Sequence, residues 1–242
     1  MTDTEVPVPP WRRAAPKRSG VTRPPLSQDQ IIDAGLRIVT EEGIAAVSMR
    51  RIAAVFHTGA SSLYAHVANK EELLQLMFDR ICADVPVPEP DPAHWQDQIK
   101  QLSRDGHATM TAHGDIAGAA LATIPTGPNA MRVSDAMLGI MLAGGVPPKV
   151  AGWALDRIFL YMVADAYESS LYHSRIGPGA DDVTKYFDVL TEQIATFYES
   201  VPADRYPNLR KHARDLVDGD GGQRFEFGLD MLIDGLAKYV ET

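Results

Sequence analysis

Apolar residues recur at helical spacing through nearly all of the chain after residue 26, and proline or glycine interrupts each run. In the first run the apolar positions are Ile31, Ala34, Gly35, Ile38 and Val39. This spacing puts one apolar stripe along an α-helix. No segment shows convincing alternation of apolar and polar residues between turns, which is typical of a half-buried strand. The sequence therefore predicts an all-α protein.

Polar residues that favour helix ends stand at the borders of these runs. The predicted caps are, in chain order, Ser27 with Gln30, then Gly43, Ser48, and Asn69 with Glu72. Ser27 and Gln30 have the spacing of a capping box, in which each side chain bonds the other residue's backbone N–H. These signals predict a compact unit of three helices within residues 27–80.

The run "PVPEPDP" at Pro86–Pro92 stops helix formation, because proline lacks a backbone N–H and clashes with the preceding turn. We therefore expect a larger helical unit over residues 93–242. Its predicted helices begin at Trp95, lie near Asp115–Ala122 and Ala130–Ala143, open at Pro148, line Val183–Phe197, and close the chain over Phe225–Val240. The stretches "RIGPGADD" and "DGDGGQ" predict flexible breaks before the last two.

Composition narrows the setting. The chain has 242 residues, 45% of them hydrophobic, which is enough for a substantial core. No segment approaches the ~18 unbroken apolar residues of a membrane span, and the N-terminus lacks the apolar run of a signal peptide. The single cysteine, Cys82, excludes an internal disulfide and suits a reducing compartment. We expect a cytoplasmic protein with no membrane partner.

Charge is unevenly distributed. Residues 1–26 hold five basic and two acidic residues, a net charge of +3. The whole chain has a net charge of −9, so residues 27–242 together carry −12. This segment also holds six prolines and is predicted to be a disordered basic arm. The arm either contacts an acidic partner or is merely a solvated tail.

The stretch "SMRRIAAVFHTGASSLYAHVANKEEL", from Ser48 to Leu73, predicts two short helices around a tight turn. A helix-turn-helix places its second helix in the DNA major groove. Ser61 and Ser62 are small enough to approach base edges, and Leu63 is expected to point back to the core. An ordinary helical hairpin in a bundle is the alternative reading of this pattern.

The segment Leu26–Ile81, and above all "SLYAHVANKEELL", resembles the DNA-binding domain of the TetR family of bacterial regulators. The runs "HWQDQIKQL", "TIPTG" and "FEFGLDMLIDGL" are similar to the C-terminal domain of its tetracycline-repressor type, so the resemblance reaches Val240. It implies that operator DNA is contacted by Arg50, Ser61, Ser62, Tyr64, His66 and Lys70. His57 departs from the glycine usual in that turn, but histidine tolerates unusual backbone angles better than most residues.

The basic arm lies directly before the first helix of this domain. The domain itself offers few cations for phosphate, so the arm is a candidate source of more. Arg18 and Arg23, with Arg12 and Arg13, are placed to enter a neighbouring minor groove, as arms of other DNA-binding domains do.

The resemblance also implies a homodimer, held by a four-helix bundle to which each subunit gives two helices. In this chain these would be the helix from Pro148 to Tyr167 and the helix from Phe225 to Val240. Gly228 and Gly235, seven residues apart, would let helices approach closely. The same glycines are also compatible with packing inside one subunit.

The resemblance further predicts a ligand site with altered chemistry. Where the family's tetracycline-binding members hold a magnesium–drug chelate through a histidine, this chain has Ala120. Ile124 replaces an arginine, whereas Thr123 and Pro125 remain. Without the imidazole a hard cation loses its direct ligand, so we expect no metal and no cofactor.

Softer side chains take the place of the polar ones. Leu102 and Met137 stand where the family has polar drug contacts, and Met110, Ile124 and Tyr206 are further candidates. Methionine adapts to irregular apolar ligands, so we expect a hydrophobic small-molecule effector. Each of these residues is equally compatible with plain core packing.

Other functions remain open on the sequence alone. His107, His113, Asp105 and Asp115 lie close together, but they lack a recognised ligand spacing, and the sequence has no nucleotide or hydrolase motif. We therefore expect no enzyme. The predicted function is a ligand-responsive repressor; an activator, or a regulator gated by a partner protein, is the alternative.

Overall fold

The computed structural model describes residues 26–121, 126–176 and 183–240, and this part of the chain is built from helices without a strand. The all-α prediction is confirmed. In chain order the α-helices are α1 (Gln28–Glu42), α2 (Met49–Val55), α3 (Lys70–Cys82), α4 (Trp95–Thr111), α5 (Ala117–Ala120), α6 (Pro128–Ala143), α7 (Pro148–Ile176), α8 (Val183–Ser200), α9 (Pro207–Lys211), α10 (Ala213–Val217) and α11 (Gly221–Leu236). Short 3-10 turns η1 (Ile44–Ala46), η2 (Ala60–Ser62) and η3 (Ala237–Tyr239) complete them.

The predicted caps of the N-terminal unit are present. Ser27 and Gln30 form the capping box at the start of α1, and Gly43 ends this helix with a φ of 81°. The Ser48 side chain accepts a hydrogen bond from the N–H of Arg51. Glu72 departs slightly from the expected box, because its carboxylate accepts from the N–H of Ala68, one residue before the Asn69 cap.

The proline run holds no helix, and the C-terminal helices α4, α6 and α7 pack against one another beyond it. Tight packing explains some small residues here. A side chain on Gly144 would overlap the ring of Trp95, since a Cβ there would lie 2.2 Å from the Trp95 Cγ. The helix predicted near Asp115–Ala122 is only one turn long, Ala117–Ala120.

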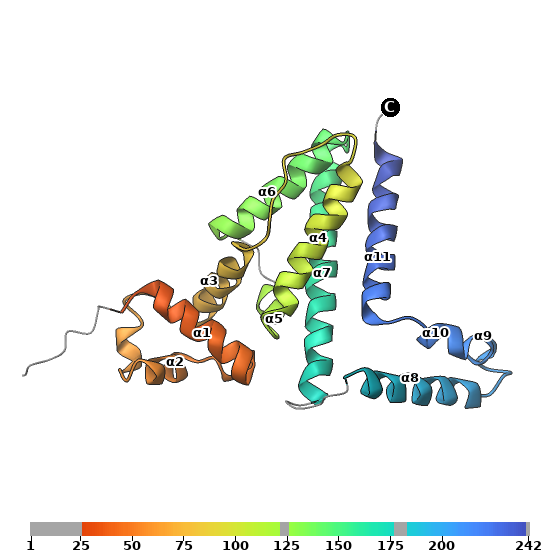
Figure 1. Cartoon of the computed structure of the whole chain (residues 1–242), viewed down its shortest axis with the longest axis horizontal. Helices are drawn as coiled ribbons and strands as arrows, with labels where there is room; N and C mark the ends of the chain where they lie inside the picture. Colours follow the sequence, from red (N-terminus) through yellow and green to blue (C-terminus); the bar gives the residue numbers. More distant parts are fainter. Residues whose placement is uncertain (1–25, 122–125, 177–182, 241–242) are drawn as a thin grey trace, which may run out of the picture.

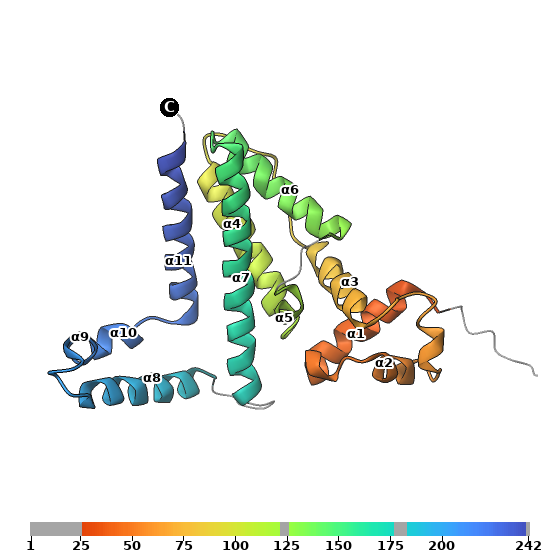
Figure 2. The same cartoon turned by 180° about the vertical axis from the view of Figure 1, so that it is seen from behind.

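Helix α11 lies beside α7 in both views and also packs against α4 (Figures 1 and 2). It starts at Gly221, where Asp220 and Gln223 form a second capping box. The prediction of a flexible break at "DGDGGQ" was therefore wrong over its second half, because these polar residues satisfy the first N–H groups of the helix.

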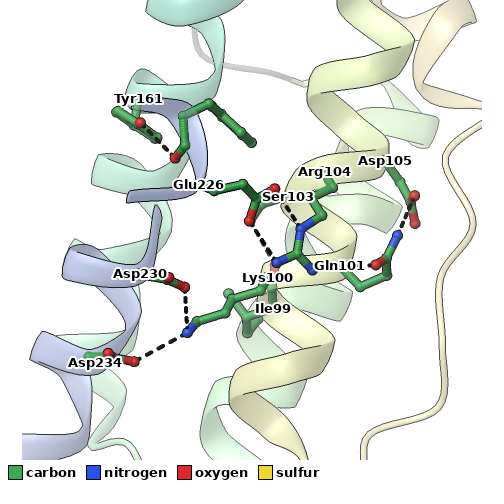
Figure 3. A network of polar contacts seen from close by, with 11 residues as sticks. Ile99, Lys100, Gln101, Ser103, Arg104, Asp105, Tyr161, Glu226, Asp230 and Asp234 are labelled. Atoms are coloured by element: carbon green, nitrogen blue, oxygen red, sulfur yellow. Dashed lines mark hydrogen bonds and ion pairs between the residues drawn. The ribbon is translucent and has the colours of Figure 1, made fainter. Parts of the chain in front are cut away.

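A ladder of ion pairs joins α11 to α4 (Figure 3). Arg104 makes two hydrogen bonds to Glu226, at 2.8 and 2.7 Å, and Lys100 bonds Asp230 at 2.7 Å and Asp234 at 3.3 Å. The three carboxylates are four residues apart and thus share one face of α11.

Gly228 belongs to packing within the chain. A Cβ at this position would lie 2.2 Å from the hydroxyl oxygen of Tyr161, which bonds the carbonyl of Phe225 at 2.9 Å. Gly235 differs, because nothing lies within 4 Å of its Cβ position. Of the two glycines assigned to a dimer contact, Gly228 thus serves the α7–α11 contact, and only Gly235 is left open.

Helices α8, α9 and α10 form an extension that projects from the C-terminal end of α7 away from the other helices (Figures 1 and 2). This α8–α10 extension has little core of its own, and several of its large apolar side chains are exposed: Val189, Phe197, Tyr206, Leu209 and Leu216. No helix in the described part of the chain is long and apolar enough to cross a membrane.

Candidate functional site

The turn after α2 has the geometry that the helix-turn-helix pattern requires. His57 has a φ of 52°, in the left-handed region, so it adopts the conformation for which glycine is usual. The N–H of Thr58 bonds back to the carbonyl of Ala53 and closes the end of α2. The departure at His57 therefore leaves the turn intact.

The segment after the turn is not the short α-helix that the sequence predicts. Ser62 and Leu63 donate to carbonyls three residues back, both at 3.0 Å, which makes a 3-10 turn followed by further turns to residue 66. Serines bond locally and favour such short turns over an α-helix. Leu63 and Val67 are buried, as predicted for Leu63, and they fix the exposed side of the segment.

Most predicted DNA contacts are exposed on this unit. Arg50, Ser61, Tyr64 and Lys70 are all exposed, with 54% of Tyr64 accessible. His66 is half-buried, and its carbonyl accepts a hydrogen bond from the Gln28 side chain at 2.9 Å. This bond holds the segment against the start of α1. Arg18 and Arg23 lie outside the described residues.

The Ser62 hydroxyl has a hydrogen-bond partner that was not predicted. Its hydroxyl oxygen lies 2.9 Å from that of Thr58, so the two hydroxyls share one hydrogen bond across the turn. The Ser62 hydroxyl therefore has a partner within the turn while it remains on the exposed surface. The signal that would have predicted it is the four-residue spacing of two hydroxyl residues around a turn.

Ion pairs within the N-terminal unit reduce the cations available to DNA. Arg51 bonds Glu42, which raises the pKa of Arg51 and lowers that of Glu42. Arg80 pairs with Asp29 and Asp33 of α1. Within described residues 26–80, this leaves Arg37, Arg50 and Lys70 without an ion pair, a smaller set than the sequence suggests.

The polar cluster that an enzyme would need does not form. The Nε2 of His107 lies 2.7 Å from Asp165, whereas His113 bonds a carbonyl of its own helix. Asp115 accepts the N–H of Ile44 at 2.7 Å, and Asp105 accepts from Gln101. These four groups serve four separate contacts, and the described residues hold no group of three or more metal-binding side chains.

An apolar hollow of about 50 Å³ lies between α3, α4, α6 and α7. Met110 and Met137, both predicted, line it, as do seven large apolar residues that were not predicted as ligand contacts: Phe78, Ile81, Val85, Val133, Leu155, Phe159 and Met162. Their signal was helical periodicity alone, which cannot separate a cavity wall from solid core.

The other predicted ligand residues lie elsewhere. Leu102 is buried but does not line the hollow, and Tyr206 is exposed at the start of α9 in the α8–α10 extension. Thr123, Ile124 and Pro125 lie outside the described residues. Cys82 does line the hollow, and burial raises the pKa of its thiol to about 12, so the thiol stays protonated at neutral pH.

A buried joint connects α3 with α6 beside this hollow. One carboxylate oxygen of Asp79 accepts the backbone N–H groups of Asn129, at 3.0 Å, and Ala130, at 2.9 Å, and so caps the first turn of α6. In the other direction Arg132 on α6 donates to the carbonyls of Cys82 and Val85 at the end of α3, both at 3.0 Å. Each helix thus caps the other.

Gly127 is required at this joint, because a Cβ there would lie 2.2 Å from the Asp79 carboxylate carbon. Asp79 is only 9% exposed, and its bonds to the start of α6 hold it in place. The joint is a buried polar contact between the N-terminal unit and the helices that surround the hollow.

The N-terminal unit has an exposed helix-turn-helix face, and α3 joins it to a C-terminal domain with an apolar hollow. This arrangement is typical of one class of proteins, the transcriptional regulators with an N-terminal DNA-binding domain. The chain matches the family model for bacterial regulatory proteins of the tetR family over residues 31–77. It also matches the tetracyclin repressor-like C-terminal domain over residues 87–240. The chain belongs to the TetR family of transcriptional regulators and is not an enzyme.

Curated relatives agree with this assignment. The chain is 29% identical, over 90% of its length and 80% of the relative, to the HTH-type transcriptional repressor DrrR1 of Streptomyces coeruleorubidus. It is 25% identical to the class G tetracycline repressor of Vibrio anguillarum, covering 88% of this chain and 94% of that one.

Solved structures are similar in fold as well. ActR, a TetR family protein of Streptomyces coelicolor, was solved in complex with (S)-DNPA, and it matches with a TM-score of 0.78 and 36% identity. That match covers 89% of this chain and 99% of ActR. ActR in complex with actinorhodin matches with the same TM-score and identity.

Proposed function

We propose that this protein is a homodimeric repressor that binds operator DNA through Arg50, Ser61, Ser62, Tyr64, His66 and Lys70 and releases it when a hydrophobic small molecule enters the α3–α4–α6–α7 hollow. The observation that carries the proposal is the reciprocal cap between α3 and α6. It makes the wall of the hollow and the support of the DNA-binding unit one connected structure.

The effector argument starts from the lining of the hollow. Nine of its side chains are Phe, Met, Ile, Leu or Val, a composition suited to an apolar ligand. ActR, at 36% identity, was solved with two different small molecules, which supports a ligand-responsive role here. Coupling follows if the ligand shifts α6, because Asp79 and Arg132 tie α6 to α3.

The dimer argument starts from exposed apolar side chains on α7 and α11. Trp153 and Leu160 on α7 are 62% and 43% exposed, and Phe227 and Met231 on α11 are 65% and 59% exposed. A row of this kind on two neighbouring helices is typical of an obligate interface. Two copies would bury the row and present two DNA-binding units to successive major grooves.

Dimerisation is tested with two exposed methionines. Met231→Asp on α11 should shift the sedimenting species from dimer to monomer, because it puts a charge into the proposed interface. Met131→Asp on α6, 51% exposed and outside this row, is the matched control and should leave the dimer intact. If both variants remain dimeric, the α7–α11 interface is wrong.

DNA binding is tested by fluorescence anisotropy of labelled DNA from the region upstream of the protein's own gene. We expect saturable binding that weakens with salt and outcompetes random DNA. Lys70→Ala should weaken it, and Lys238→Ala, on η3 far along the chain, should not. Removing residues 1–25 should lower both the affinity and its salt dependence if the basic arm contacts phosphates.

Release is then tested by adding actinorhodin or (S)-DNPA, the molecules held by ActR, to the protein–DNA complex. A fall in operator affinity with either probe supports the repressor proposal. Tight operator binding that neither of these probes nor a broad panel of hydrophobic compounds weakens would overturn the ligand-responsive part and leave a regulator gated in another way.

A further inference from the structure

A second, larger cavity adjoins the apolar hollow. It has a volume of about 230 Å³ and lies where α3 meets α5 and the start of α6. It therefore sits between the DNA-binding unit and the ligand-binding domain. Figures 1 and 2 show α3, α5 and the start of α6 close together near the centre of the molecule. We call this space the junction cleft.

Phe78 and Ala130 line both the junction cleft and the apolar hollow, so they form the wall between them. The Phe78 ring packs edge to face on Phe159, with ring centroids 6.2 Å apart, and Phe78 is 7% exposed. Ala130 contributes only a methyl group. One aromatic side chain thus separates the two spaces.

The apolar hollow is too small for the effector that its lining suits. Its 50 Å³ is less than the ~150 Å³ cavity that admits one benzene ring. Drug-sized ligands occupy roughly 300–1,000 Å³. Turning the Phe78 ring is the shortest way to enlarge it, because the junction cleft lies directly behind this ring.

The junction cleft has a different chemistry from the hollow. Its polar lining includes the carboxylates of Glu72 and Asp79 and the amide of Gln75, and among the described residues that line it there is no Lys or Arg. A cavity edged by two carboxylates with no compensating cation favours a positively charged group. The apolar hollow offers no such preference.

We propose that the hollow and the junction cleft are two halves of one site, joined when Phe78 moves, and that the effector is an amphipathic molecule with an aromatic body and a cationic amine. The body occupies the hollow, and the amine lies in the cleft beside Glu72 and Asp79. This inference rests on the proposed ligand-responsive function and names the chemical class of its ligand.

The position of the amine gives a route to DNA release. Asp79 holds the first N–H groups of α6, at 2.9 and 3.0 Å. A cation beside this carboxylate competes with these two N–H groups for the one oxygen that accepts both. The ligand thereby displaces the first turn of α6 from Asp79, and the bonds from Arg132 carry this displacement to the end of α3 and so to the DNA-binding unit.

The experiment compares three probes that share one ring system: aminomethyl-, hydroxymethyl- and carboxy-anthracene, which are cationic, neutral and anionic at neutral pH. Their binding to the full-length protein is measured by anthracene fluorescence anisotropy, and release of the labelled operator is measured in parallel. We expect the amine to bind roughly tenfold more tightly than the carboxylate, equivalent to one favourable charge contact.

Two glutamines make a matched pair of variants. Gln75→Lys puts a cation into the junction cleft and should abolish or reverse the preference for the amine. Gln193→Lys makes the same charge change on exposed α8 and should preserve it. Both sites are exposed, so neither substitution threatens the core.

Phe78→Leu tests the wall. A smaller, more flexible side chain opens the passage more easily, so all three probes should bind several-fold more tightly while the order of preference is kept. Unchanged affinities would show that Phe78 does not divide the site.

The outcomes separate this inference from the proposed function. Operator release by all three probes with equal affinity overturns the amine preference and leaves the ligand-responsive proposal standing. Absence of saturable binding by the aminomethyl probe overturns the inference as well, and the actinorhodin and (S)-DNPA titrations then judge the proposed function independently. A preference for the amine that Gln75→Lys does not change places the cation elsewhere and refutes the cleft.

Discussion

Two sets of polar contacts tie helices of this molecule together, and they differ mainly in burial. At the α3–α6 joint the capping carboxylate of Asp79 is 9% exposed. At the α4–α11 ladder the side chains of Arg104 and Glu226 are 38% and 42% exposed. The joint connects the DNA-binding unit to the ligand-binding domain, whereas the ladder holds a helix of the proposed dimer face.

The difference teaches which contact carries energy. A buried carboxylate that satisfies several N–H groups is costly to remove, because those donors lose their partner away from water. Exposed ion pairs compete with water and salt, and they contribute little. The buried contacts at the joint should therefore contribute more to stability than the exposed ladder in Figure 3.

The largest expected effect comes from Asp79→Ala. It leaves the N–H groups of Asn129 and Ala130 without their partner and should lower the free energy of unfolding by roughly 3 kcal/mol. Asp79→Asn, which keeps one acceptor, should lose about half as much. Denaturant titration at fixed protein concentration measures both, with Asp84→Ala, at an exposed aspartate after α3, as the control. A loss no larger than the control's would refute the buried cap.

Gly228→Ala should have the next largest effect. The new Cβ overlaps the Tyr161 hydroxyl, so the ring moves and its bond to the Phe225 carbonyl is lost, at a cost of roughly 2 kcal/mol. Gly235→Ala is the matched control, because its Cβ meets nothing within the chain. Alanine favours a helix over glycine, so this variant should be neutral or slightly stabilising in thermal unfolding. If Gly235→Ala instead lowers the unfolding temperature while the protein remains dimeric, then Gly235 packs closely against a second copy.

Arg132→Ala tests the other half of the joint. The carbonyls that it releases at the end of α3 are partly exposed and can bond water, so the loss of stability should be only about 1 kcal/mol. The effect of this substitution on ligand-induced DNA release should be larger, because a shift of α6 is no longer transmitted through Arg132 to the end of α3. We expect a higher concentration of actinorhodin or anthracene amine to be needed for operator release. Arg157→Ala, whose ion pair is confined to the neighbouring Asp156, should leave release unchanged.

The smallest effect belongs to the ladder. The hydrogen bonds from Arg104 lower the pKa of Glu226, so this pair stabilises the fold above the ordinary carboxyl pKa and loses that contribution as the pH falls through the lowered value. Glu226→Gln should cost about 0.5 kcal/mol at neutral pH, and the difference from the unmodified protein should vanish in acid. Unfolding free energies measured at both pH values check this, with Glu71→Gln as the control. A difference that persists in acid would exclude the ion pair as its cause.

Local signals in the sequence predicted most of the long helices, although not the short α9 and α10. Ser27, Ser48 and Asn69 cap the helices that they were expected to cap, because a cap depends on residues within four positions of one another. At "DGDGGQ" the Asp220–Gln223 capping box starts α11, although glycines in this stretch are typical of a break. At η2 the apolar spacing predicts an α-helix, but the structure has a 3-10 turn.

The sites depended on contacts between segments far apart in the chain. Periodicity marked Met110 and Met137 as apolar, but only tertiary packing decided that they line a hollow while Leu102 fills core. Asp79 read as one more polar residue on a helix, and its role arises from α6, 50 residues away. The sequence by itself determined the helices, their caps and the family. The folded structure alone decided which polar groups are buried, since burial depends on what the whole chain places around them, and burial sets the free energy of each contact.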